Sequence, residues 1–267
     1  MTDPTSALAV AVEIAREHGV RVHEPLVLAD GANLLVHLRP APLVAKVALS
    51  THLVREPAVW LARELAVAAH LHGAGVPVVR ASDLLPTVVH ERGGQVMTVW
   101  EHLPHDSAAV IGPDELGPLL RELHAALRTC TVPLGHLATP LEDVARFLQT
   151  RGSGGMQRAF EALELPTGLE QSLHGDPHPG NLLRGPGGWV WADLEDTCAG
   201  PLAWDLACVA ASTRVDGAAA LRAYGPHEDL APWLVLRRLH ATAWTCLYAE
   251  RLPRHRDGAA AMLAAGG

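Results

Sequence analysis

Apolar side chains recur at two different spacings near the start of the chain. Between Ser6 and Glu17 they lie three or four positions apart, and Gly19 follows, which predicts a helix with a glycine stop. Two short apolar runs, at 34–38 and 43–49, flank the turn residues Arg-Pro-Ala-Pro at 39–42. Apolar runs around a proline-rich turn predict two paired strands.

A long helix and a second hairpin are predicted next. Helical spacing continues over 55–71, where Gly73 and Pro77 then prevent the helix from extending. The runs at 87–91 and 95–100 surround Arg-Gly-Gly and predict a hairpin. With the segment 24–30 that leads into Gly31, the first hundred residues should therefore hold about five strands and one long helix.

The remainder of the chain is predicted to be mainly helical. Leucines recur at helical spacing over 113–127, and further helices are expected at 141–149, 157–163 and 229–251, followed by an alanine-rich last helix.

One loop in this region carries an unusual concentration of polar side chains. Pro177 and Pro179 cannot continue a helix, so we expect a rigid loop that runs into a strand at 181–183. The loop has the spacing His-x-Asp-x-x-x-x-Asn, with Asp176 and Asn181 five residues apart. Protein kinases use this spacing, with the Asp orienting the substrate hydroxyl and the Asn holding magnesium.

A predicted hairpin follows this loop and ends in a carboxylate. The turn 184–188 is rich in Gly and Pro, and the apolar run 189–192 leads to Asp193. Because a hairpin brings its outer ends together, Asn181 and Asp193 can share one ion. Their oxygen atoms are of the kind that magnesium prefers.

Lys46 is the only lysine among 21 Lys and Arg residues. It lies in Val-Ala-Lys-Val-Ala at 44–48, close to the Val-Ala-Ile-Lys pattern in which a lysine binds nucleotide phosphates. A charged side chain between apolar residues is costly if it is buried and unpaired. The alternative is a lysine on an edge strand that faces water.

These motifs together resemble the aminoglycoside phosphotransferase family. The resemblance rests on His174-Gly175-Asp176, His178 and Asn181, followed by Asp193-Leu194-Glu195 and Asp205. It implies an α+β, protein-kinase-like fold with two lobes. Residues 1–101 would form a small antiparallel-sheet N-lobe with one long helix that binds the nucleotide. Residues 102–267 would form a larger, mainly helical C-lobe.

The resemblance also implies a role for each site residue, with ATP or GTP and Mg²⁺ as cofactors. Asp176 would be catalytic, and Glu64 on the long helix would pair with Lys46, Glu56 being its rival. The other roles are nucleotide contacts by Gly31, Asn33, Trp100, Glu101 and His102, metal binding by Asn181 and Asp193, and support of the site by His174, His178 and Asp205.

Composition narrows the class of protein. The chain has 267 residues, is 49% hydrophobic and 19% charged, and has a net charge of −8, which argues against nucleic acid as a partner. Its four cysteines are widely spaced, and the first residues lack the pattern of a signal peptide. We expect a cytoplasmic protein that binds a small molecule and no membrane, as a monomer or weak homodimer.

The loop and several acidic residues indicate candidate substrates. Gly175 replaces the Arg that protein kinases carry before the catalytic Asp, which points away from a protein substrate. The acidic residues Glu195, Asp196, Glu228 and Asp229 would suit a cationic aminoglycoside or related antibiotic. The alternatives are a kinase of choline, a sugar or an amino alcohol, and a nucleotide-binding pseudokinase. Two other possibilities are a metal hydrolase using His174, Asp176 and His178, and a loop whose polar residues only cap turns.

Overall fold

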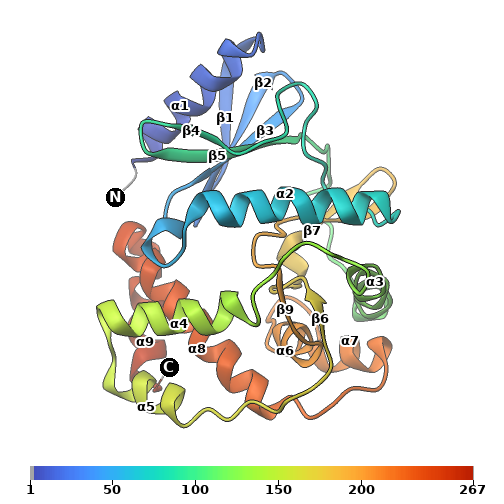
Figure 1. Ribbon diagram of the computed structural model, residues 1–267, viewed down its shortest axis with the longest axis vertical. Helices are drawn as coiled ribbons and strands as arrows, with labels where there is room; N and C mark the ends of the chain where they lie inside the picture. The colour runs from blue at the N-terminus through green and yellow to red at the C-terminus, as the bar shows by residue number, and fades with distance from the viewer. Residues whose placement is uncertain (1–2, 267) are drawn as a thin grey trace. The chain divides into compact units, whose positions relative to one another are not determined.

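The computed structural model describes residues 3–266 (Figure 1). The chain forms two compact units. The first contains the residues up to Asp106 together with Arg184–Glu195, and the second contains Ser107–Leu183 together with the residues from Asp196 onward. One hairpin that follows the polar loop thus joins the first unit.

The first unit is built on a five-stranded antiparallel sheet. The strands lie in the order β1-β2-β3-β5-β4, and the predictions of about five strands and of both hairpins are confirmed. Their bounds are β1 Val22–Asp30, β2 Asn33–Pro40, β3 Leu43–Ala48, β4 His90–Arg92 and β5 Gln95–Glu101.

Helix α1, Pro4–Glu17, covers one face of this sheet (Figure 1). It begins where Asp3 accepts a hydrogen bond from Ser6 N at 3.1 Å, as an N-cap residue does. Ala45 and Val47 of β3 are buried in the core that α1 completes. Side chains alternate along a strand, so Val44 and Lys46 lie on the opposite face of the sheet.

Helix α2, Pro57–Gly73, packs against β5 in the same unit. It begins two residues later than predicted, because Pro57 fills the first helical position, where no N–H is needed. Arg55 and Glu56 therefore precede the helix. The short helical turn η1, Thr51–Leu53, joins β3 to this segment.

The hairpin that follows the polar loop consists of β7, Leu182–Gly185, and β8, Gly188–Trp191. Gly188 has φ of 124°, a conformation that glycine adopts without a steric cost. The strand expected at 181–183 was placed one residue too early, because Asn181 belongs to the turn η2, Pro179–Asn181.

The second unit is mainly helical, as predicted. The short strands β6, Glu170–Leu173, and β9, Cys198–Pro201, form an antiparallel pair that the sequence patterns did not predict. The sequence patterns did not predict helix α7 either. The helices are α3 Pro113–Leu127, α4 Ala138–Arg151, α5 Gly154–Glu161, α6 Ala203–Ala210, α7 Gly217–Tyr224, α8 Ala231–Arg251 and α9 Arg256–Ala264.

Helix α8 is central to the packing of the second unit. It contacts α4, α6 and α9 and buries Trp233, Leu236 and Leu247 among them. This packing places Arg237 of α8 beside the loop that precedes β7. Within residues 3–266, no helix is both long enough and apolar enough to cross a membrane.

Candidate active site

Lys46 on β3 is surrounded by three carboxylates of the first unit. Its Nζ lies 2.9 Å from both side-chain oxygens of Glu64, 2.7 Å from Asp193 Oδ1 and 2.8 Å from Glu195 Oε2. Burial alone would lower the pKa of Lys46, but the three negative charges outweigh it and raise the pKa well above its usual value. The ammonium is therefore charged at neutral pH.

Glu64 lies on α2 and is the residue expected to contact Lys46. Besides the ammonium, its Oε1 accepts a hydrogen bond from Leu194 N at 3.1 Å. Burial acts to raise the pKa of Glu64, and the charge of Lys46 opposes this effect and favours the ionised carboxylate. The rival residue, Glu56, immediately precedes α2, and Lys46 reaches Glu64 instead.

Glu195 closes a buried polar network in the first unit. Its Oε2 accepts a hydrogen bond of 2.7 Å from Asn33 Nδ2, and Arg55 Nη1 lies 3.7 Å from Oε1. Sequence analysis assigned Glu195 to the substrate, whereas here it is buried beside Lys46. The position of Glu195, two residues after Asp193, could have suggested that it lies near Lys46. The contact of Arg55 with Glu195 left no signal in the sequence.

Asp193 differs from the other two carboxylates around Lys46. Its side chain is 49% exposed, compared with 3% for Glu64 and 7% for Glu195. Its φ is 57°, in the left-handed region that non-glycine residues seldom occupy and that is often found at functional positions. One oxygen faces Lys46 while the carboxylate remains open to solvent.

The predicted nucleotide-loop residue Gly31 lies between β1 and β2 and donates its N–H to Asn33 O at 3.1 Å. The predicted hinge residues Trp100 and Glu101 end β5, and His102 follows it. The indole of Trp100 donates to Thr98 Oγ1 at 2.9 Å, and Glu101 pairs with Arg80.

His102 packs against a residue that sequence analysis did not single out. Its ring stacks on His37 of β2 with centroids 3.8 Å apart and planes 7° apart, and its backbone N–H donates to Pro42 O at 2.8 Å. Burial lowers the pKa of both histidines. The charge of Arg39 lowers the pKa of His37 further, and the charges of His37 and His105 lower that of His102 further. These shifts favour the neutral form of both rings.

The polar loop of the second unit is held by Asp205 at the start of α6. One carboxylate oxygen accepts from Gly175 N and the other from His174 N, each at 2.9 Å. His124 Nε2 lies 2.9 Å from the second oxygen, and Trp204 Nε1 donates to Gly175 O at 2.8 Å. Asp205 and Trp204 of α6, with His124 of α3 beside Asp205, thus fix the backbone of the loop just before Asp176.

Gly175 is required by this geometry. Its φ is 89°, and a Cβ atom at this position would lie 1.9 Å from the carbonyl oxygen of Asp196. Any larger residue would be strained in its backbone and would also clash. The glycine that replaces the protein-kinase arginine is therefore a structural requirement of this loop.

Asp176 is bound by groups on both of its oxygens. Arg237 Nη2 of α8 lies 2.8 Å from Oδ1, and His178 Nε2 lies 3.4 Å from Oδ2. Burial acts to raise the pKa of Asp176, but the charge of Arg237 and the contact with His178 hold it well below its usual range. The position of Arg237 on an apolar helix gave no signal of this contact in the sequence.

The other loop residues are oriented by short-range hydrogen bonds. Gly180 N donates to His178 Nδ1 at 2.9 Å, so His178 Nε2 carries the proton that faces Asp176. Asp176 N donates to His174 Nδ1 at 3.3 Å. Asn181 Nδ2 donates to the backbone oxygen of Asp176 at 2.9 Å, which uses the donor side of this amide.

The remaining predicted substrate residues lie in the second unit. Asp196 is half-buried and close enough to Arg237 for its charge to raise the pKa of the guanidinium. Glu228 and Asp229 are exposed in the segment before α8, and Asp229 Oδ1 accepts from Ala231 N at 3.1 Å. The structure therefore does not gather the four predicted acidic residues into one cluster within either unit.

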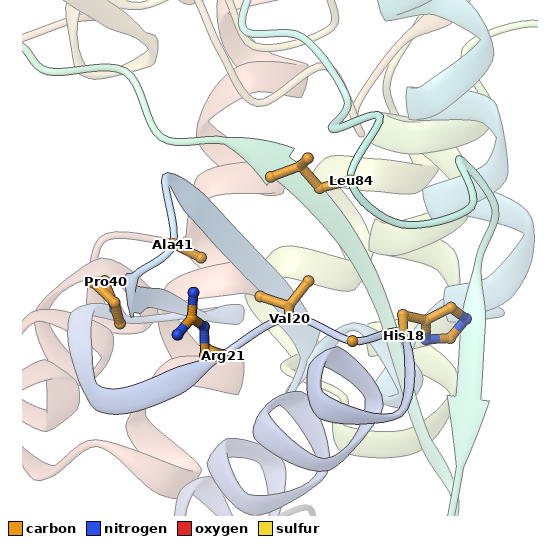
Figure 2. Close-up of a pocket in the computed structure, with 7 residues that line it drawn as sticks. His18, Val20, Arg21, Pro40, Ala41 and Leu84 are labelled. Carbon is orange, nitrogen blue, oxygen red and sulfur yellow. The ribbon is translucent and has the colours of Figure 1, made fainter.

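A pocket of about 440 Å³ lies elsewhere in the first unit (Figure 2). It is lined by residues that follow α1, by the turn between β2 and β3, and by Leu84, and none of the predicted site residues is among them. Within residues 3–266, no group of three or more His, Cys, Asp or Glu side chains could hold a metal ion by itself.

An antiparallel sheet with one long helix, combined with a mainly helical unit that holds the polar loop, defines a protein-kinase-like fold. The sequence model of the phosphotransferase enzyme family matches residues 25–239. The chain belongs to this family, and the protein is a phosphotransferase. A comparison with curated protein sequences finds no match.

Solved structures share the fold over nearly the whole chain. The amicoumacin kinase hAmiN, in complex with AMP-PNP, Ca²⁺ and amicoumacin, is 13% identical with a TM-score of 0.69, covering 100% of this chain and 96% of its own. The aminoglycoside-3′-phosphotransferase of type VIII is 20% identical with a TM-score of 0.66, covering 88% and 98%. Choline kinase LicA from Streptococcus pneumoniae is 18% identical with a TM-score of 0.66, covering 96% and 98%.

Proposed function

We propose that the protein is a small-molecule kinase that transfers the γ-phosphoryl group of ATP or GTP to a hydroxyl group. The observation that carries this proposal is the environment of Lys46, a buried, charged ammonium oriented by Glu64 and by the half-exposed Asp193. Phosphoryl transfer depends mainly on positioning and on charge stabilisation, and a fixed cation beside an accessible carboxylate supplies both.

The first unit would bind the nucleotide on the face of the sheet that carries Lys46. Lys46 would contact the α- and β-phosphates while Glu64 keeps its ammonium in place. Gly31 and Asn33 would lie over the phosphates, and the backbone from Trp100 to His102 would bind the base. Support comes from the alternation of side chains along β3: Ala45 and Val47 face the core that α1 completes, and Val44 and Lys46 lie on the other face of the sheet.

The donor atoms present fit a magnesium ion. Asp193 offers a half-exposed carboxylate, and Asn181 uses its amide nitrogen on Asp176 O, which leaves the amide oxygen as the atom for a cation. Asn181 and Asp193 would hold Mg²⁺. The bound ion would neutralise negative charge on the phosphate oxygens during transfer.

Asp176 would accept a hydrogen bond from the acceptor hydroxyl and orient it for attack on the γ-phosphorus. The low pKa of Asp176 keeps the carboxylate charged, so it is ready to accept this hydrogen bond at neutral pH. His174, His178 and Asp205 would support the loop through the contacts that they make with its backbone and with Asp176.

For the acceptor we propose an aminoglycoside or a related cationic antibiotic. The proposal draws on the substrates named for hAmiN and for the type VIII enzyme, and on the acidic residues Asp196, Glu228 and Asp229. The choline kinase among the similar structures keeps an amino alcohol as the second candidate. The four reduced cysteines suit a cytoplasmic enzyme.

The test is nucleotide turnover in the presence of Mg²⁺, measured with ATP and with GTP against a panel of aminoglycosides, other cationic antibiotics, choline and amino alcohols. We expect turnover to depend on one acceptor class and to fall by roughly 10³-fold or more in Asp176→Ala, since general-base and positioning contributions are both lost. Asp114→Asn, an exposed change on α3, is the matched control. Nucleotide binding without transfer to any acceptor would support a pseudokinase instead.

A further inference from the structure

Two consecutive arginines on α8 have opposite surroundings. Arg237 is nearly buried, with 16% of its side chain exposed, and its guanidinium reaches Asp176 Oδ1 at 2.8 Å. Arg238, the next residue along the helix, is exposed. The packing of α8 against α4 and α6 fixes the direction of Arg237, because Leu236 and Leu239 on either side of it are buried.

The guanidinium of Arg237 lies in a strongly charged environment. The negative charges of Asp176 and Asp196 raise its pKa against the effect of burial, and Cys208 on α6 is a further neighbour. On the same helix, one turn later, His240 is close enough to affect Asp176 through its charge. His240 is itself anchored, since its Nε2 lies 3.1 Å from Asp143 Oδ2.

Asp176 has the freedom to rotate about its side-chain bonds unless something restrains it. Its backbone is fixed by the contacts around Gly175, but those contacts do not determine where each carboxylate oxygen points. A guanidinium on Oδ1 restrains one oxygen, and the longer contact of 3.4 Å from His178 leaves Oδ2 the more weakly bound of the two. Oδ1 is buried and makes no hydrogen bond within the described residues, so the ion pair with Arg237 is the interaction that holds this oxygen in place. An arginine suits this task, because its charge is kept when the group is buried.

We propose that Arg237 is a positioning residue for phosphoryl transfer, which holds Asp176 by Oδ1 so that Oδ2 is presented to the acceptor hydroxyl. This inference rests on the proposed function. A merely structural Arg237 would compensate a buried charge and stabilise the fold without affecting the orientation of the acceptor. The two roles differ in what they predict for kcat and for rescue by a small guanidinium compound.

The experiment compares Arg237→Ala, Arg237→Lys and Arg238→Ala as matched control. For Arg237→Ala we expect kcat to fall by roughly 10²-fold, the loss typical of a slightly misplaced catalytic group, with the KM for nucleotide within about twofold of the wild-type value. Arg237→Lys should recover part of kcat, and added guanidinium ion should raise kcat of Arg237→Ala several-fold. Arg238→Ala should match the wild type and show no rescue.

A double-mutant cycle with Asp176→Asn and Arg237→Ala, read by the midpoint of thermal unfolding, measures the ion pair without any activity. We expect the two shifts to be strongly non-additive. Additive shifts would overturn the inference, and so would an unchanged kcat in Arg237→Ala or an equal response of Arg238→Ala to guanidinium. If Arg237→Ala fails to fold, a kcat of Arg237→Lys equal to the wild-type value overturns it.

Failure of the proposed function would look different. In that case the wild-type protein transfers phosphate to no acceptor, and the role of Arg237 falls with it even if the cycle shows coupling. An active wild type with an equally active Arg237→Ala overturns the role of Arg237 alone.

Discussion

Glu195 Oε2 lies 2.8 Å from Lys46 Nζ, although β3 and the segment after β8 are far apart in the sequence. The same oxygen accepts a hydrogen bond from Asn33. Three buried or half-buried carboxylates therefore depend on a single ammonium, supported by Arg55 beside Glu195. This dependence makes Lys46 a structural as well as a proposed functional residue.

Replacement of Lys46 by Met should affect stability and nucleotide binding together. Removing one partner of a buried ion pair leaves uncompensated charges, so we expect a loss of about 3–5 kcal/mol in the free energy of unfolding. Denaturant unfolding and nucleotide titration are the measurements. Arg16→Met, which changes an exposed arginine on α1, is the control, and equal stability of the two variants would contradict the prediction.

Gly175 should tolerate no side chain. In Gly175→Ala the methyl group would meet Asp196 O while the backbone keeps φ near 89°, so we expect a loss of at least about 3 kcal/mol and of catalytic activity. The matched control is Gly187→Ala in the β7–β8 turn, where no atom lies within 4 Å of the added group. Thermal unfolding of both variants checks this, and a Gly175→Ala protein as stable as Gly187→Ala would disprove it.

Asp205→Asn should disorder the polar loop. The neutral amide keeps the shape but offers a single acceptor oxygen where His174 N, Gly175 N and His124 now share two. Charged acceptors bind about twice as strongly as neutral ones, and we expect a loss of about 2–3 kcal/mol together with a fall in kcat. Asp216→Asn is the control, because Asn caps α7 as well as Asp does. Unfolding and turnover of the two variants are compared side by side.

The stacked pair of His37 and His102 should make stability fall in acid. Burial lowers the pKa of both rings below the ordinary 6.5, so at mildly acidic pH the unfolded chain binds more protons than the folded one. Stability conferred by the pair is fully present above pH 6.5 and declines as the pH falls from there toward the lowered pKa values. In His37→Phe, which keeps a ring but cannot be protonated, the drop in unfolding temperature between pH 7.5 and 5.5 should shrink.

The control for this prediction is His52→Gln, which changes an exposed histidine of the same unit. It should show the wild-type drop. A drop in His37→Phe as large as that of the wild type would show that the stacked pair does not carry the pH dependence.

Local patterns in the sequence were sufficient for most elements of the fold. The leucine spacing of α3 gave both of its ends, and the Gly and Pro turns gave the hairpins of the first sheet and β7–β8. These features follow from side-chain periodicity and from backbone limits at Gly and Pro, which act over a few residues. The strands β6 and β9 were not predicted, because each has only four residues and they pair with each other over a long distance in the sequence.

The sequence by itself determined the family, the spacing from Asp176 to Asn181 and the special status of Lys46. Only the tertiary structure decided that Glu195 joins Lys46, that His37 stacks on His102 and that Arg237 binds Asp176. The physical reason is that each of these contacts joins residues on different elements. Their energies depend on burial and distance, which packing creates and which no local periodicity records.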